Sequence, residues 1–123
     1  MKRNFKKILC FDIDGVICKT NKIRNYKKSF PIKKNINYIN KLYEQNYKII
    51  LFTARFMGRS NENANLAKKK ASKLTLAQIK KWKLKFHKIY FGKPSYDLFI
   101  DDKNLSFKNN WIQDLKKKLN NVS

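Results

Sequence analysis

The sequence predicts an α/β fold in which helices pack against a mainly parallel sheet. The first observation is a set of short apolar runs with little alternation, typical of strands that are buried on both faces of a parallel sheet. These runs are residues 8–13, 48–53, 88–91 and 97–101. The second observation is that helical periodicity separates most of them, which requires right-handed crossovers between parallel strands. Because the chain has 123 residues, we expect residues 1–123 to form a single domain with one core.

The first half of the chain contains two predicted strands and one predicted helix. Residues 8–13 form the first strand, and the polar residues 19–30 form a flap-like excursion after it. A helix follows, because apolar residues recur at helical spacing and Ser29 and Pro31 suit its cap and its first turn. The recurring apolar residues are Ile32, Ile36, Ile39, Leu42 and Tyr43. Residues 48–53 then form the second strand.

The second half begins with a helical connection over residues 57–86, of which residues 57–73 are expected to be only partly helical. Thr75 and Gln78 have the spacing of a capping box at the start of a helix. Apolar residues continue that helix at Leu76, Ile79, Trp82 and Phe86. The third and fourth apolar runs follow as strands. A final helix carries its apolar residues on one side, at Trp111, Ile112, Leu115 and Leu119.

The charge is strongly positive, with 30 Lys and Arg against 8 Asp and Glu and a formal net charge of +22. Such a balance raises nucleic acid as a partner. The basic residues are almost all Lys and are spread along the chain, whereas readers of phosphates and bases tend to use the planar fork of Arg. A solvated surface that reflects general compositional bias is therefore the favoured interpretation, and a nucleic-acid partner the less favoured one.

The cysteines and the N-terminus bear on the cellular compartment. Cys10 and Cys18 match neither a zinc motif nor a disulfide framework, so we expect reduced, structural thiols in the cytoplasm. The N-terminus is basic like that of a signal peptide, but Asp12 and Asp14 interrupt its apolar segment, which argues against secretion. No run of about 18 apolar residues exists, so no membrane partner is predicted.

Polar residues follow the predicted strands at the points where ligands bind in open α/β sheets. The first strand ends near Asp12 and Asp14, the second at Thr53, and Lys93 follows the third. Further candidates at these strand ends are Ala54, Arg55, Asp101 and Asp102. Folding is expected to gather carboxylates, a hydroxyl and an ammonium at one edge of the sheet.

This set of groups suits phosphoryl transfer. Carboxylates clustered without His or Cys favour a hard ion such as Mg²⁺, which shares itself with phosphate oxygens. A lysine and a threonine beside the ion would bind the remaining phosphoryl oxygens. One aspartate can attack phosphorus to form an aspartyl-phosphate, and a second can act as the general acid and base.

The segments FDIDGV, ILFTAR and GKPSYDLFIDD resemble, in order, the four motifs of the haloacid dehalogenase (HAD) superfamily. The resemblance covers most of the chain and implies a three-layer, Rossmann-like sandwich that binds Mg²⁺. It implies that Asp12 is the nucleophile and that Asp14 is the general acid and base. The remaining implied roles are phosphate binding by Thr53, Ala54 and Lys93, and metal binding by Asp12, by the backbone carbonyl of Asp14, and by Asp101 and Asp102. Arg55 and Arg59 are candidates for contact with an anionic substrate.

The acid at Asp14 favours a phosphatase or phosphotransferase within the superfamily, since dehalogenases lack it. The gaps from Asp14 to Thr53 and from Thr53 to Lys93 are too short for an ordinary cap domain, so we expect a capless protein. Capless members act on macromolecules or cover the site by forming dimers or tetramers. The motifs resemble HAD proteins associated with capsular or surface polysaccharide, which implies a sugar phosphate, and also resemble deoxyribonucleotidase-like proteins, which implies a nucleotide.

Three hypotheses follow. The favoured one is a Mg²⁺-dependent phosphatase, a phosphoric monoester hydrolase, acting on a small sugar phosphate, with a nucleotide as the alternative substrate. The second is a phosphatase that acts on nucleic-acid ends, consistent with the absent cap and the charge. The third is a binding module that keeps the fold without catalysis, although intact Asp12, Asp14 and Lys93 argue against it.

Overall fold

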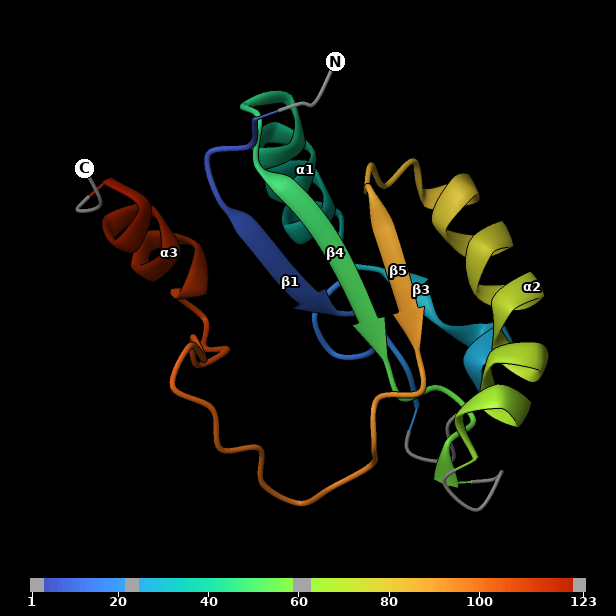
Figure 1. Ribbon diagram of the computed structural model, residues 1–123. Coiled ribbons are helices and arrows are strands. Elements are labelled where there is room, and N and C mark those ends of the chain that lie inside the picture. Colours follow the sequence, from blue (N-terminus) through green and yellow to red (C-terminus); the bar gives the residue numbers. More distant parts are fainter. Residues whose placement is uncertain (1–3, 22–24, 59–62, 121–123) are drawn as a thin grey trace.

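A parallel sheet of three strands lies at the centre of the fold (Figure 1). The computed structural model describes residues 4–21, 25–58 and 63–120. The strands are β1 (Ile8–Asp12), β4 (Lys48–Thr53) and β5 (Lys88–Phe91), in the order β1-β4-β5. Asp12 pairs with Phe52 and Thr53 pairs with Phe91, so the carboxyl ends of all three strands meet at one edge. The first three predicted strands are thereby confirmed.

The polar excursion after β1 forms a small antiparallel ribbon. Its strands are β2 (Cys18–Lys19) and β3 (Phe30–Pro31), and a short 3-10 helix at Tyr26–Lys28 precedes β3. The backbone N–H of Ile32 donates to the carbonyl of Ile17 at 2.8 Å, which closes the base of the ribbon. This segment is called the flap below, and it comprises the described residues of 18–31.

The described residues also form three α-helices, which complete the mixed α/β fold: α1 (Lys33–Glu44), α2 (Ala64–Trp82) and α3 (Trp111–Asn120). In Figure 1, α1 lies behind the sheet, α2 flanks β5 and α3 lies on the side of β1. The ring of Trp111 on α3 meets the ring of Phe11 on β1 edge to face, with centroids 6.1 Å apart. No helix among the described residues is both long enough and apolar enough to cross a membrane.

The core gathers apolar side chains from the sheet, the flap and all three helices. On β4 burial alternates: Ile49 and Leu51 are fully buried, whereas Ile50 and Phe52 are half-buried. The apolar runs led us to expect equal burial on both faces of the sheet. On β4 one face is instead more buried than the other. The most buried apolar residues of the cluster are Ile13, Ile17, Cys18, Ile39, Leu42, Ile49, Leu51 and Ile79.

The predicted fourth strand over residues 97–101 is wrong. The structure gives these residues no strand pairing, and residues 92–110 form an irregular connection from β5 to α3. Leu98 and Ile100 are 84% and 94% exposed, so the apolar character that suggested a buried strand is not matched by burial. As a result, within the described part of the chain β1 pairs only with β4 and forms one edge of the sheet.

The predicted helix starts also need correction. Thr75 and Gln78 do not form a capping box, because α2 begins at Ala64 and both residues lie in its interior. The side chain of Asn63 caps the helix by accepting from the N–H of Leu66 at 3.0 Å. At α1 the N-cap is Ile32, while Pro31 belongs to β3. Residues 64–82 contain neither Gly nor Pro, so nothing in the sequence interrupts this long helix.

Candidate active site

The carboxyl edge of the sheet brings together residues from three strand ends. Asp12 is the last residue of β1, Thr53 is the last of β4, and Gly92 and Lys93 follow β5 directly. The backbone N–H of Lys93 donates to the carbonyl of Thr53 at 3.0 Å, which extends the strand pairing to the lysine. The turn depends on Gly92, whose φ of +92° is one that other residues rarely adopt.

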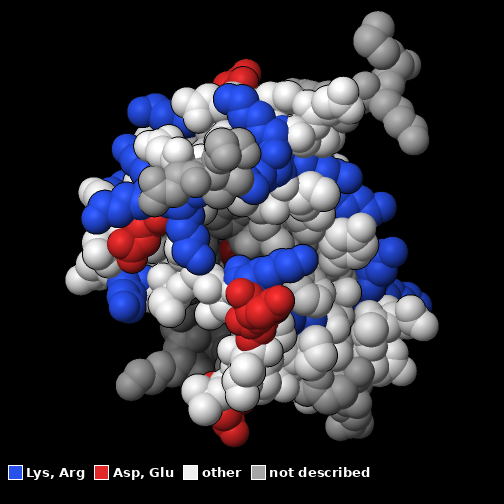
Figure 2. Space-filling view, turned by 60° about the vertical axis from the view of Figure 1, so that its left-hand side comes forward, with Lys and Arg blue, Asp and Glu red and all other residues white. Residues whose placement is uncertain are grey.

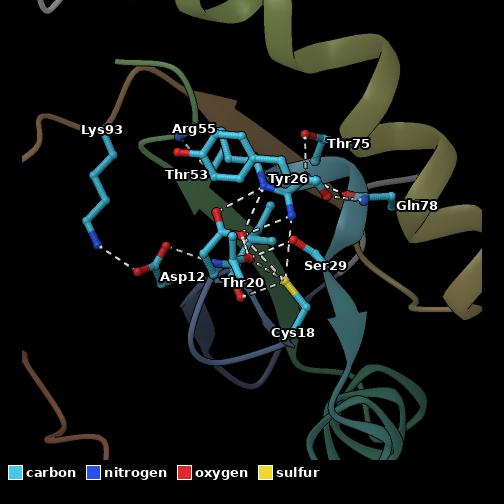
Figure 3. A network of polar contacts seen from close by, with 12 residues as sticks. Asp12, Cys18, Thr20, Tyr26, Ser29, Thr53, Arg55, Thr75, Gln78 and Lys93 are labelled. Carbon is cyan, nitrogen blue, oxygen red and sulfur yellow. Dashed lines mark hydrogen bonds and ion pairs between the residues drawn. The ribbon is translucent and has the colours of Figure 1, made fainter. Parts of the chain in front are cut away.

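Asp12 and Lys93 form an ion pair at this edge (Figure 3). The Lys93 Nζ lies 3.5 Å from one carboxylate oxygen of Asp12, and the backbone N–H of Ile13 donates to the other at 2.8 Å. The Asp12 side chain remains 37% exposed, so a substrate can reach it, whereas the Lys93 side chain is 11% exposed. The arrangement offers one accessible nucleophilic oxygen beside a fixed positive charge.

The environment shifts the pKa of both partners upward. Burial raises the pKa of Asp12, and the charge of Lys93 only partly opposes it. Burial by itself lowers the pKa of Lys93, but a hydrogen bond with Tyr96 and the charge of Asp12 outweigh burial and raise it. Lys93 is therefore held as an ammonium, the form that binds phosphoryl oxygens.

Aromatic rings surround the Lys93 ammonium. Its Nζ lies 5.9 Å from the ring centroid of Phe52, 5.2 Å from that of Tyr96 and 5.7 Å from that of Phe99. A cation over aromatic faces at such distances is attracted to them. The rings thus help to fix the direction of the lysine side chain toward Asp12.

Asp14 is held by a different cation, Arg55. The Arg55 Nε lies 3.0 Å from Asp14 Oδ2 and 3.2 Å from Asp14 Oδ1. The Nη2 of Arg55 also donates to Asp14 Oδ1, at 3.0 Å. The Thr20 hydroxyl also donates to Asp14 Oδ1, at 2.6 Å. Protein groups therefore bind both carboxylate oxygens of Asp14.

Arg55 is not placed to contact a substrate, contrary to the sequence-based expectation. It is 1% exposed, although it follows directly from the strand end. Besides Asp14, its guanidinium donates to Thr75 at 3.1 Å and to Gln78 at 2.5 Å, and it lies over the ring of Tyr26 (Figure 3). The other arginine candidate, Arg59, lies outside the described residues.

Thr53 is fully buried, and its hydroxyl accepts from the backbone N–H of Arg55 at 3.1 Å. Ala54 is half-buried between them. The hydroxyl of Thr53 therefore helps to shape the turn after β4, in the same stretch of chain that was predicted to hold phosphate.

The predicted metal site is not assembled in this arrangement. Asp101 and Asp102 are exposed in the connection from β5 to α3, and Asp101 accepts from the backbone N–H of Lys103 at 3.2 Å. Over residues 4–21, 25–58 and 63–120, no group of three or more His, Cys, Asp or Glu side chains is placed to hold an ion. The carboxylates of Asp12 and Asp14 alone do not complete the oxygen ligands that Mg²⁺ prefers.

Several residues of this network were missed by the sequence analysis. They are Cys18, Thr20, Tyr26, Ser29, Thr75 and Gln78. One signal was available, because Thr75 and Gln78 are polar residues three apart on one helix face, a spacing that we interpreted as a cap. The contacts of Tyr26 and Ser29 depend on how the flap folds back, for which the sequence carries no pattern.

No protein-family model and no curated protein sequence matches the chain. Among solved structures, the chain is similar to the crystal structure of an MCSG target from Vibrio cholerae, with a TM-score of 0.75 and 22% sequence identity. The similarity covers 91% of this chain and 98% of the Vibrio protein. At this identity the comparison supports the α/β fold and carries no information on activity.

Proposed function

We propose that the protein is a HAD-type phosphomonoester hydrolase that acts through an aspartyl-phosphate, with a small sugar phosphate as substrate. The observation that carries the proposal is the accessible Asp12 carboxylate held 3.5 Å from the Lys93 ammonium at the carboxyl edge of a parallel sheet. The proposal includes the finer fold assignment, a capless three-layer Rossmann-like sandwich. It also includes cytoplasmic localisation and a dependence on Mg²⁺.

The proposed chemistry begins with attack of an Asp12 oxygen on phosphorus. The P–O bond to the leaving group breaks, and Asp14 gives that oxygen a proton, which yields an alcohol and an aspartyl-phosphate. Asp14 then takes a proton from water as the water oxygen attacks phosphorus, which releases phosphate and restores Asp12. Lys93 neutralises charge on the phosphoryl oxygens throughout.

No step is assigned to the metal, because the described carboxylates do not complete a site for it. The dependence on Mg²⁺ rests on the sequence motifs, and it requires Asp101 or Asp102 to approach Asp12 more closely than in this arrangement. An assay with and without added Mg²⁺ therefore tests a separate part of the proposal.

The test measures phosphate release by purified protein with Mg²⁺ from a panel of sugar phosphates and nucleotides. We expect turnover of a sugar phosphate by the wild type, and a loss of at least about 100-fold in kcat for Asp12→Asn. Lys93→Met is expected to lose activity too, whereas Lys41→Met, on the exposed side of α1, serves as a matched control for loss of one positive charge. Absence of turnover across the panel, or full activity in Asp12→Asn, would refute the proposal.

A phosphatase acting on nucleic-acid ends is the second candidate, and the charge of the surface favours it. Figure 2 shows Lys and Arg side chains around much of one face, with few acids between them. This candidate predicts oligonucleotide binding that weakens steeply with salt and faster release of terminal phosphates than of sugar phosphates. Binding of a phosphorylated ligand without turnover, unchanged in Asp12→Asn, would instead indicate a non-catalytic binding module.

A further inference from the structure

We propose that Arg55 is a positioning residue that joins Asp14, the flap and α2 into one unit at the edge of the sheet. The proposal rests on contacts of a single buried guanidinium with five residues from three parts of the chain: Asp14, Cys18, Tyr26, Thr75 and Gln78. Its catalytic consequence depends on the proposed phosphatase function, whereas its structural content does not.

The burial of Arg55 favours a positioning role for this residue over direct binding of a substrate. The residue is 1% exposed, and its donors are directed to Asp14, Thr75 and Gln78. A buried guanidinium requires such partners, because an unpaired one would be strongly destabilising. Since every named donor already meets a protein acceptor, an anionic substrate would have to displace one of these contacts to bind Arg55.

The flap is tied to the same unit at two points. The Thr20 hydroxyl donates to Asp14 and lies 2.7 Å from the Ser29 hydroxyl, so Thr20 links the carboxylate to the other side of the ribbon. The Gln78 side chain, whose oxygen accepts from Arg55, donates through its nitrogen to the backbone carbonyl of Tyr26 at 2.6 Å. Gln78 thus connects α2 to the flap on the far side of the guanidinium.

Lysine would not reproduce this arrangement. Arg presents five N–H donors in a rigid planar fork, and here that fork meets Asp14 on one edge and Thr75 with Gln78 on another. A lysine ammonium at the same place would keep the charge but could not span both edges. Loss of the fork should therefore let the Asp14 carboxylate and the flap move relative to Asp12.

The test combines kinetics with a spectroscopic readout in the full-length protein. In wild-type protein labelled with ¹⁵N, the Arg55 Nε–H should appear as a signal that exchanges slowly with water. The chain has only four arginines, so its assignment by Arg55→Lys is direct. Asp14→Asn should accelerate this exchange at least about 10-fold, whereas Asp12→Asn, a matched loss of one carboxylate, should leave it unchanged.

The kinetic prediction for Arg55→Lys is a loss of about 10- to 100-fold in kcat with KM within about twofold, because misplacement of a catalytic group slows chemistry more than binding. Arg55→Gln should lower kcat more than Arg55→Lys does. Gln78→Leu, which removes one partner of Arg55 on α2, should lower kcat less. If Arg55→Lys and Arg55→Gln fail to fold, the test uses Gln78→Leu and Thr20→Val instead. Both should lower kcat, by less than the loss expected for Arg55→Lys.

The outcomes separate this proposal from the proposed function. Rapid exchange of the wild-type Arg55 Nε–H, or slow exchange that persists in Asp14→Asn, would refute the positioning role of Arg55. This conclusion would hold whether or not the protein has phosphatase activity. A rise in KM with unchanged kcat in Arg55→Lys would overturn that role in favour of substrate binding. If the wild type has no phosphatase activity but the exchange pattern is as expected, the proposed function fails while the positioning unit stands.

Discussion

Gly92 should be the most sensitive glycine in the protein, because it carries two separate constraints. Its φ is +92°, and a Cβ at this position would lie 2.7 Å from the Cβ of Ala64, the first residue of α2. Ordinary contacts between such carbon atoms are about 3.5–4.0 Å. Gly92→Ala therefore forces either the turn after β5 or the start of α2 to move.

The expected magnitude follows from adding the two effects. A left-handed backbone costs a non-glycine residue about 1–2 kcal/mol, and overpacking by one methyl group costs about 1–3 kcal/mol. We therefore expect Gly92→Ala to lower the free energy of unfolding by about 2–5 kcal/mol. With an unfolding entropy of about 2.1 cal/mol/K per residue, this corresponds to a fall of roughly 8–19 °C in Tm for a chain of this length.

Thermal unfolding followed by circular dichroism gives the measurement, and Gly58→Ala provides the matched control. Among the residues that the structure describes, a Cβ at Gly58 meets nothing within 4 Å, and the φ of Gly58 lies outside the left-handed region. The control should therefore change stability by less than about 0.5 kcal/mol. Equal Tm values for the two variants would refute the reasoning. Because Lys93 follows Gly92 directly, Gly92→Ala should also slow the proposed phosphatase reaction by displacing the ammonium from Asp12.

Three further predictions concern the core, the thiols and Asp12, the proposed nucleophile. Asn35 is buried, donates to the carbonyl of Val16 at 2.7 Å and accepts from the Trp111 indole at 3.2 Å. Asn35→Ala should cost about 2–4 kcal/mol in urea unfolding, while the exposed Asn37→Ala should cost little, and similar losses would refute the role of these bonds. Burial, chiefly, raises the pKa of Cys18 to about 11, so only about one thiol in a thousand is ionised at pH 8. Iodoacetamide followed by mass spectrometry should therefore modify the exposed Cys10 first, and faster labelling of Cys18 would contradict the structure. Folding raises the pKa of Asp12, so its contribution favours the folded state at low pH and is lost as pH rises through the folded value. Asp12→Asn should hence have a higher Tm than the wild type at pH 7 but not at pH 3, and a lower Tm at pH 7 would contradict this sign.

The sequence was most informative where a local pattern and burial agree. The strands β1, β4 and β5 and the helices α1 and α3 were predicted because their apolar residues recur with one period and meet one core. Residues 97–101 carry the same apolar signal, but a strand also needs a pairing partner, and no local pattern specifies one. The start of α2 was missed because its first turns contain mostly Lys and Ala, which have high helix propensity but form no amphipathic pattern there.

For the candidate site, the sequence located the strand ends but not the contacts between them. The proximity of Asp12 and Lys93 follows from parallel strands that end at one edge. The pairing of Asp14 with Arg55 was not foreseen, because the position of Arg55 after the second motif made it a candidate for contact with an anionic substrate. Only the fold shows that α2 and the flap enclose this side chain.

The position of β1 at the edge of the sheet has a consequence for colloidal behaviour. An edge strand presents unpaired backbone donors and acceptors to which a strand of another chain can add, and lysines are a common protection against such aggregation. Lys6 and Lys7 precede β1 directly and are exposed. With a net charge of +22, two copies repel each other before their edges can meet. We therefore expect part of the excess of lysine to oppose aggregation at this edge of the sheet, a role that requires no binding partner.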